Sequence, residues 1–388
     1  MELSGFVGRR DKIYIGIRDK IYCRTLVLKQ DVAIALVSCD VLGIPSEVAY
    51  SIDEYARRIG INNTVIMATH THYAPATIQM RMAGNVDQEY LKLFEDKIKG
   101  SIEEAVNRLV SVMDVTITEG DAEGLCMKRI VRRPVKNNVI MIKFNGNAKS
   151  VIINFNCHPI TLGPYYRYIS SDYASYIYNY FSERGIEALF INGAAGDVNP
   201  GVSGEDGITI IGEGIIRALN RGETMNLTPQ LEARTVNVTL TKRMERLITM
   251  KRIYYELLSR VIKTPWTLAM RDWSRDLINA IRSGELVYEE RVSITGIKVS
   301  REAAIVTCPC ELSSTLGEAI MSKSPFKYTV IAGYANGYIG YIIDPALAGR
   351  AHYELGESYR FHDLLPLSKD SADKIVHAML GVLNDLTK

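Results

Sequence analysis

Short runs of apolar, often β-branched residues alternate with longer amphipathic stretches along this chain of 388 residues. Such runs are typical of strands that are covered on both faces, and the stretches between them have the apolar spacing of surface helices. We expect strands at residues 32–39, 64–68, 139–144, 151–156, 187–191, 292–299, 303–308 and 328–332, and helices at residues 45–60, 86–110, 172–184 and 209–220. The pattern predicts an α/β fold in which a layered mixed or parallel sheet is covered by helices.

Residues 241–286 differ from the rest of the chain, because they are long, rich in arginine and helical in pattern. They hold both tryptophans, Trp266 and Trp273, and Pro265 interrupts them. No fixed repeat or low-complexity linker marks a boundary on either side. We expect one domain over residues 1–388, with residues 241–286 as a helical insertion within it.

The charges of the chain nearly cancel, since 46 basic side chains face 44 acidic ones and the formal net charge is +2. A protein that neutralises many phosphates needs a basic excess, so nucleic acid is not an expected partner. No apolar run reaches the roughly 18 residues of a membrane span, so no transmembrane segment is expected. The opening residues lack the apolar core of a secretion signal. We expect a cytoplasmic protein whose six scattered cysteines are reduced and mostly buried.

The segments that follow the predicted strands gather polar and ionisable residues. Ligands of open α/β sheets bind outside the carboxyl ends of the strands, where loops converge over a rigid base. In this chain those segments contain Asp40, the pair His70 and His72, His158, residues 192–200 (NGAAGDVNP), Glu311, and the pair Tyr338 and Tyr341. We therefore expect the functional site at the carboxyl ends of the strands.

A metal site is the interpretation favoured by the histidines and Glu311 together. His70 and His72 are two residues apart, which places both imidazoles on one side of a pleated strand end. Glu311 follows a buried Cys-Pro-Cys segment, where a carboxylate needs a metal or an arginine to offset its desolvation. With His158, these residues match the nitrogen and oxygen ligands of a catalytic zinc. The alternative is a set of structural histidines bonded to backbone carbonyls.

Two further features have two or more interpretations each, and a third marks the start of a helix. Residues 192–201 (NGAAGDVNPG) could cradle a phosphate, form a tight strand-to-helix crossover, or provide the floor of a substrate site through Gly193 and Asp197. Asp172 stands where an N-cap belongs, with Gly185 just past the end of the same helix. The basic run at residues 128–133 (KRIVRR) either anchors a polar or anionic part of a substrate, with Arg129 as the candidate, or is a solvated face.

Several segments, in order along the chain, resemble the neutral/alkaline (non-lysosomal) ceramidase family. They are ATHTHYAP (68–75), NFNCHPITLG (154–163), ISSDY (169–173), FINGAAGDVNP (190–200), CPCELSSTLGE (308–318), and GYANGYIGYIIDP with HYELGESY (333–359), and residues 19–40 resemble the family's N-terminal strands. The resemblance implies a zinc bound by His70, His158, Glu311 and Tyr341. It also implies that His72 and Tyr353 line the reacting centre.

The chain departs from that family at a central position. Ceramidases typically carry serine in the Gly-Asp-Val-Ser-Pro segment, whereas this chain has Asn199, whose amide cannot act as a nucleophile. We also expect neither the family's secretion signal nor its C-terminal immunoglobulin-like domain, so the resemblance is to a catalytic domain alone. Asn199 is expected to orient the substrate instead.

We expect a zinc-dependent hydrolase that cleaves the amide bond of a small molecule or an N-acyl lipid with metal-activated water. In this hypothesis His72 moves a proton between the water and the leaving amine, and Tyr353 donates a hydrogen bond to the oxyanion. One alternative is a metal-dependent hydrolase of another small ester or amide. The other is a non-catalytic, anion-binding protein in which the histidines are structural.

Overall fold

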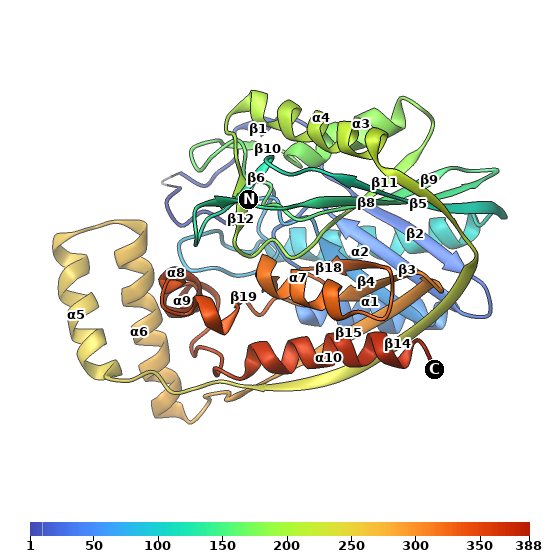
Figure 1. Ribbon diagram of the computed structural model, residues 1–388. Coiled ribbons are helices and arrows are strands. Elements are labelled where there is room, and N and C mark those ends of the chain that lie inside the picture. Colours follow the sequence, from blue (N-terminus) through green and yellow to red (C-terminus); the bar gives the residue numbers. More distant parts are fainter. Residues whose placement is uncertain (10) are drawn as a thin grey trace.

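The fold consists of two layers of β-sheet packed face to face between two layers of helices. A computed structural model describes residues 1–9 and 11–388 of the chain (Figure 1). One layer is a five-stranded sheet of order β11-β9-β8-β5-β13, in which β11 and β9 are parallel and the other pairs antiparallel. Its strands are β5 (Val112–Asp121), β8 (Asn138–Gly146), β9 (Ser150–Phe155), β11 (Glu187–Asn192) and β13 (Glu223–Leu227).

The second layer holds two smaller sheets side by side. Their orders are β2-β3-β4 and β14-β15-β16-β18, and each contains one parallel pair, β3 with β4 and β16 with β18. Backbone hydrogen bonds between β4 and residues 334–336 join the two sheets. Their strands are β2 (Cys23–Lys29), β3 (Ala33–Cys39), β4 (Asn63–Ala68), β14 (Pro229–Thr241), β15 (Glu289–Ser300), β16 (Ala303–Thr307) and β18 (Tyr328–Ala332).

Short strands connect these sheets near one edge. Pairs form between β1 (Gly16–Ile17) and β10 (Tyr168–Ile169), and between β17 (Glu311–Leu312) and β19 (Tyr341–Ile342). A three-stranded sheet contains β6 (Cys126–Lys128), β7 (Arg133–Pro134) and β12 (Val198–Pro200).

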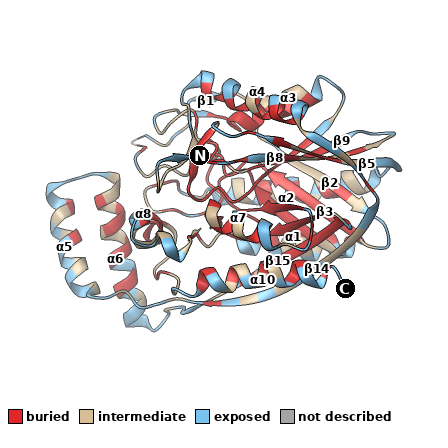
Figure 2. Ribbon diagram, in the orientation of Figure 1, coloured by how far each residue is buried: buried red, intermediate tan, exposed pale blue. Residues whose placement is uncertain are grey.

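The strands are buried on both faces because each face has its own partner. Ile34 and Leu36 of β3 point into the core between the sheet layers, whereas Ala35 and Val37 pack against helices. The helices α3 (Tyr173–Ser182) and α4 (Glu205–Arg221) cover the five-stranded sheet, α1 (Ser46–Arg58) and α2 (Gln88–Asn107) cover β2-β3-β4, and α7 (Ser314–Lys323) and α10 (Ser371–Asp385) cover the four-stranded sheet (Figure 2). The predicted α/β class is confirmed, and the sheets are mixed.

Residues 241–286 form a helical hairpin between β14 and β15. These strands pair from Thr241 opposite Glu289 onward, so the hairpin leaves and re-enters the sheet at one point. It consists of α5 (Ile248–Val261) and α6 (Pro265–Ser283), and α6 starts with Thr264 as N-cap and proline at its first position. Trp273 of α6 packs against Tyr359 and Phe361 of the short helix α9 (Tyr359–His362), which follows the short helix α8 (His352–Gly356). A single 3-10 turn, Pro345–Leu347, precedes α8. The extent of the domain stays a prediction.

Asp172 does more than cap α3. Its Oδ1 accepts a hydrogen bond from the backbone N–H of Tyr173 at 2.7 Å, and its Oδ2 accepts two from Thr161, at 2.9 Å from N–H and 2.8 Å from Oγ1. Asp172 is fully buried and has φ of +56°, a left-handed conformation that non-glycine residues seldom adopt. The residue therefore fastens the segment after His158 to the start of α3.

The expectation that all six cysteines are reduced is wrong for one pair. Cys126 of β6 and Cys157, next to His158, form a disulfide, whereas Cys23, Cys39, Cys308 and Cys310 are free. The two bonded residues are 31 positions apart in sequence, and only the pairing of β6 with β12 brings β6 beside the end of β9. Within the described residues, no helix combines the length and apolar character that crossing a membrane requires.

Candidate metal centre

Three residues that follow different strands meet at the carboxyl ends of those strands. His70 follows β4, His158 follows β9, and Glu311 begins β17. The carboxylate Oε2 of Glu311 lies 3.1 Å from Nε2 of His158 and 3.4 Å from Nε2 of His70. All three side chains are buried. The structure thus places together three of the four ligands implied by the family resemblance.

The backbone fixes which ring nitrogen each histidine presents. Nδ1 of His70 lies 2.6 Å from the carbonyl of Leu42, and Nδ1 of His158 lies 3.1 Å from the carbonyl of Val198. Each Nε2 is therefore directed toward Glu311. Metal-ligating histidines commonly hold their second ring nitrogen against a carbonyl in this way. Structural histidines would give the same bonds, but they would not leave two Nε2 atoms facing one carboxylate.

His72 adds a third imidazole with unused nitrogens. The ligand nitrogens of His70, His72 and His158 lie within 4.8 Å of one another. Both ring nitrogens of His72 are buried, and neither has a hydrogen-bond partner in the described part of the chain. Burial, together with His70 and His158, lowers the pKa of His72 well below its ordinary value. Because buried polar atoms without partners are costly, this ring fits a position beside a metal or a reacting group.

His70 and His72 do not lie on one side of a pleated strand end, as the sequence predicts. β4 ends at Ala68, and His70 has φ of +68°, in the left-handed region. The rings of His70 and His72 are nevertheless 5.1 Å apart because the chain turns after the strand. Gly5 permits this, since a Cβ at Gly5 would lie 2.5 Å from Nδ1 of His72.

Glu311 is held ionised by its neighbours. Burial alone would raise its pKa, but His70 and His158 bring the pKa of Glu311 well below its usual range. The hydroxyl of Tyr338 donates a hydrogen bond to Oε1 of Glu311 at 2.6 Å. Tyr338 follows a predicted strand, but the sequence does not indicate that it bonds to a metal ligand. Its position relative to Glu311 depends on the β17–β19 pairing, which places Tyr341 beside Glu311 along the backbone.

Arg129 lies inside the site and not on a solvated face. Its guanidinium is 5.1 Å from the ring centroid of Tyr341, its Nε donates to Oε1 of Glu354 at 2.9 Å, and its Nη1 donates to Oδ1 of Asn199 at 3.4 Å. Asn199 therefore positions Arg129 through its amide oxygen. Tyr353, with its ring 6.0 Å from that of Tyr341, is 43% exposed and stands at the outer side of the site.

A cavity of about 30 Å³ lies between the histidines, Glu311 and the tyrosines. Its volume is enough for one or two water-sized occupants. His362 and Ser358 line it, which the sequence did not indicate. Burial lowers the pKa of His362 to about 4, so this imidazole is neutral near pH 7. The residues that line the cavity are Gly5, Leu42, His70, His72, Met80, Glu311, Tyr338, Tyr341, Tyr353, Ser358 and His362.

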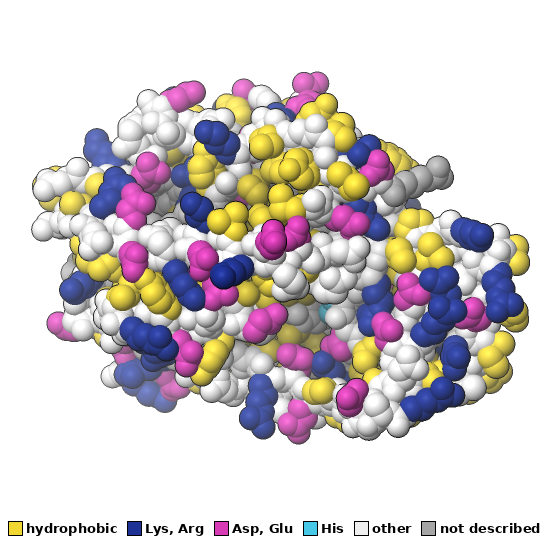
Figure 3. All heavy atoms as spheres, turned by 180° about the vertical axis from the view of Figure 1, so that it is seen from behind, with side chains coloured by type: hydrophobic (Ala, Val, Ile, Leu, Met, Phe, Trp, Pro, Cys, Tyr) yellow, Lys and Arg dark blue, Asp and Glu magenta, His cyan; other side chains and the backbone are white. Residues whose placement is uncertain are grey.

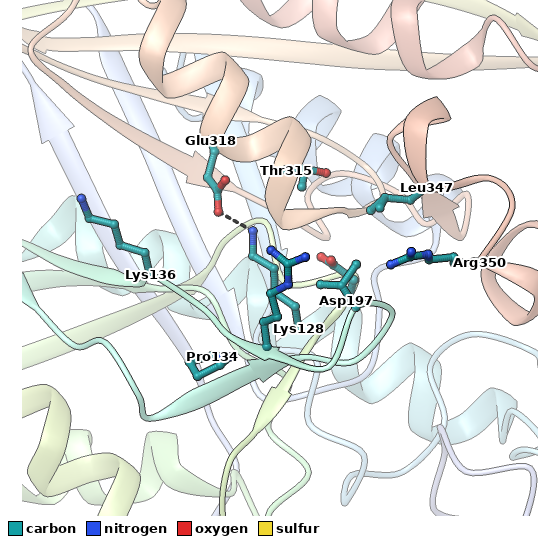
Figure 4. Close-up of a pocket in the computed structure, with 10 residues that line it drawn as sticks. Lys128, Pro134, Lys136, Asp197, Thr315, Glu318, Leu347 and Arg350 are labelled. Atoms are coloured by element: carbon teal, nitrogen blue, oxygen red, sulfur yellow. Dashed lines mark hydrogen bonds and ion pairs between the residues drawn. The ribbon is translucent and has the colours of Figure 1, made fainter.

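A larger cavity, about 600 Å³, is lined by Lys128, Val131 and Arg133 of the basic run (Figure 4). Lys128, next to Arg129, pairs with Glu318 at 2.7 Å on this side. Arg133, Lys136 and Arg350 also line it, and none of the three forms an ion pair among the described residues. The basic run is therefore divided, with Arg129 in the metal centre and Lys128 and Arg133 at a separate, positively charged cavity, which Lys136 and Arg350 also line.

The glycine-rich loop is a packed crossover and not a phosphate cradle. The amide N–H groups of residues 193–196 all bond within the protein, to Phe155, Asn156, Gly193 and Leu312. A Cβ at Gly193 would lie 1.8 Å from Oδ1 of Asn156, and one at Gly196 would lie 2.4 Å from the carbonyl oxygen of Glu311. Close approach thus requires both glycines.

The two loop residues expected to bind substrate have other contacts. Gly193 lines neither cavity described above. Oδ1 and Oδ2 of Asp197 accept hydrogen bonds from the N–H and hydroxyl of Ser314, at 2.6 and 3.2 Å, which fastens the loop to α7. Asp197 borders the larger cavity (Figure 4). A direct substrate role for either residue stays a prediction.

Comparisons with known proteins show likeness in fold. No protein-family model and no curated protein sequence matches the chain. The crystal structure of neutral ceramidase from Pseudomonas aeruginosa superposes with a TM-score of 0.75 and 15% identity, over 99% of this chain and 71% of that one. A ceramidase complexed with C2 superposes with a TM-score of 0.74 and 15% identity, over 100% of this chain and 73% of that one. The chain therefore has a fold similar to that of neutral ceramidase.

Proposed function

We propose that this protein is a zinc-dependent hydrolase that cleaves an amide bond of an N-acyl substrate. The observation that carries the proposal is the convergence of two imidazole Nε2 atoms on the buried carboxylate of Glu311, beside a third imidazole, His72, whose ring nitrogens have no hydrogen-bond partner among the described residues. The ceramidase-like fold supports the same reaction class. Zinc suits the donor set, which consists of neutral imidazoles and a carboxylate.

His70, His158 and Glu311 would hold the metal, with Tyr341 as the fourth ligand implied by the family resemblance. A bound Zn²⁺ would supply a Lewis acid and lower the pKa of a water molecule toward neutrality. The geometry leaves one competing assignment, in which His72 is the third nitrogen ligand. A His72→Ala variant distinguishes the two, because it keeps its metal if His72 transfers protons and loses it if His72 is a ligand.

The other side chains would act on the substrate. His72, with its free ring nitrogens, would carry a proton to the leaving amine, and Tyr353 at the outer side would donate a hydrogen bond to the carbonyl oxygen. Arg129 is held by Glu354 and Asn199, and it would orient the acyl or polar part of the substrate next to Tyr341. The serine of the related motif has no counterpart, so no acyl-enzyme step through position 199 is part of the proposal.

The charged cavity offers a place for a polar or anionic end of the substrate. Two segments line both cavities: the segment from β17 into α7, through Glu311 and Thr315, and residues 341–353. Arg133, Lys136 and Arg350 line the charged cavity, and within residues 1–9 and 11–388 no acidic side chain forms an ion pair with any of the three. An N-acyl molecule with a polar or anionic group is the substrate class that uses both cavities.

Metal content and a substrate panel test the proposal. Elemental analysis of the purified chain is expected to give about one zinc per chain, and His70→Ala with His158→Ala to abolish it. His377→Ala is the matched control, because His377 lies on the exposed side of α10 and bonds only to the carbonyl of Asp373. A double variant that retains zinc at the level of the control contradicts the ligand assignment.

Hydrolysis of N-acyl amides, esters and phosphoesters, with and without chelator, separates the alternatives. Chelator-sensitive cleavage of N-acyl amides supports the proposal. Cleavage of small esters alone supports the different hydrolase, and binding of anions without any turnover supports the non-catalytic protein.

A further inference from the structure

Helix α5 presents an apolar stripe to solvent. Met250, Ile253, Tyr254, Leu257 and Val261 follow the spacing of one helix face, and they are between 57% and 84% exposed. Leu247 before the helix and Ile262 after it extend the stripe, at 68% and 47% exposure. Scattered apolar residues are normal on a surface, but a continuous exposed stripe indicates a binding partner.

Basic side chains flank this stripe, and the acidic ones are turned away from it. Residues 243–263 contain six Lys or Arg and two Glu, a net charge of +4. Glu245 bonds to Lys251 and to the hydroxyl of Tyr359, and Glu256 accepts from Arg275 of α6 at 2.9 Å. Arg243, Arg246, Arg252 and Lys263 form no ion pair among the described residues. The outer side of α5 therefore offers apolar groups and cations, as Figure 3 shows for the projecting hairpin.

The opposite side of the hairpin is fixed to the body of the protein. Tyr255 of α5 packs against Trp266 and Trp273 of α6, and Trp273 packs against Tyr359. Arg360 adds a hydrogen bond from Nη1 to the hydroxyl of Tyr255 at 3.1 Å. The stripe is thus left over after the hairpin has made its internal contacts.

We propose that α5 binds the surface of membranes that contain anionic lipids. A helix with apolar and basic residues on its outer side lies in the interface, with the apolar side chains among the acyl chains and the cations at the headgroups. A second copy of this chain fits less well, because a symmetric pairing of stripes would bring two +4 surfaces together. The hairpin lies beside α8 and α9 (Figure 1), so membrane contact places the end of the molecule that carries Tyr353 near the lipid.

Vesicle co-sedimentation of the full chain tests this without any need for catalytic activity. We expect binding to phosphatidylcholine vesicles with about 30% phosphatidylserine, and at least tenfold weaker binding without phosphatidylserine or in about 0.5 M salt. Met250→Asp with Leu257→Asp is expected to lower binding at least tenfold. The matched control, Ile210→Asp with Tyr50→Asp, changes residues that are 46% and 66% exposed on other helices and should bind like wild type.

A second variant separates the two contributions. Arg243→Gln with Arg246→Gln should weaken binding to anionic vesicles at least tenfold and lower its salt dependence by about half, because the net charge falls from +4 to +2. Two results overturn the proposal: a stripe variant that binds like its control, or a wild-type chain that dimerises in solution and that the stripe variant converts to monomer. Thermal unfolding of each variant verifies that it is folded. The assay measures vesicle binding directly, so its result does not depend on whether the protein is the proposed hydrolase.

Discussion

Replacing Gly196 by alanine tests the dependence of the metal centre on close backbone packing. The added Cβ would lie 2.4 Å from the carbonyl oxygen of Glu311 and 2.9 Å from that of Leu312, whereas ordinary contact begins at 3.4 Å. Both neighbours are backbone atoms of β17, so no side-chain rotation relieves the contact. The N–H of Gly196 also donates to the carbonyl of Leu312 at 2.8 Å, which ties the two segments together.

The added Cβ is expected to displace β17 and, with it, the carboxylate of Glu311. β17 has to move by about 1 Å. The carboxylate of Glu311, now 3.1 Å from Nε2 of His158, moves with it. Changes to the support of metal ligands typically cost about 10- to 100-fold in affinity, and we expect a loss in this range. Overpacking should also lower the free energy of unfolding by about 1–3 kcal/mol.

The measurement is a zinc competition titration against a chelating indicator, with urea unfolding of the metal-free protein alongside. Gly100→Ala is the control, because Gly100 is a residue of α2 whose Cβ would meet no atom within 4 Å. It should leave zinc affinity unchanged and raise helix stability by up to about 1 kcal/mol. If Gly196→Ala retained the wild-type zinc affinity and stability, the packing argument would be refuted.

Three further predictions concern other parts of the chain. Burial raises the pKa of Asp40 to about 7; Asp40 therefore binds a proton more strongly in the folded than in the unfolded state, and its own contribution to stability falls between about pH 4 and pH 7 by on the order of 4 kcal/mol. Asp40→Asn should remove this contribution, so the free energy of unfolding of the variant relative to wild type should rise with pH across this range in urea unfolding; a difference that does not change with pH would show that Asp40 does not titrate there. Asp172→Ala should lower the free energy of unfolding by about 3 kcal/mol or more, because three buried donors lose their acceptor and alanine tolerates the left-handed backbone poorly. Asp172→Asn should lower it by less than half of that, and equal losses for the two variants would contradict the hydrogen-bond argument. Arg133→Gln with Lys136→Gln should raise KM for anionic N-acyl substrates about tenfold and leave neutral ones unchanged, with the exposed Arg132→Gln as control; equal effects on both substrate classes would exclude the cavity as an anion subsite.

The strands were predicted well where burial on both faces produced uninterrupted apolar runs. All eight predicted strands are present, such as residues 64–68 in Asn63–Ala68. The strands that were missed, such as β5 (Val112–Asp121) and β14 (Pro229–Thr241), have a more exposed face or end and carry charged residues. Without a continuous apolar run, the sequence of such strands resembles that of loops.

The candidate site was recovered in its parts and not in its arrangement. His70, His158 and Glu311 were identified as strand-end residues, and the structure brings both histidines within 3.4 Å of the carboxylate of Glu311. The hydrogen bond from Tyr338 and the contribution of His362 were not predicted. Both depend on how residues 338–362 fold back over the cavity, and no local pattern specifies such a return.

The sequence by itself determined the α/β class, the positions of eight core strands and of the helices α1 to α4, and the set of residues with metal-binding chemistry. These properties depend on local propensity, apolar spacing and side-chain type, all of which are written along the chain. The tertiary structure alone decided that Arg129 lies inside the site while its neighbour Lys128 faces another cavity, and that Cys126 joins Cys157. It also left the apolar stripe of α5 exposed. The physical reason is that these outcomes depend on which surfaces meet after folding, and contacts between residues distant in sequence leave no periodic signal.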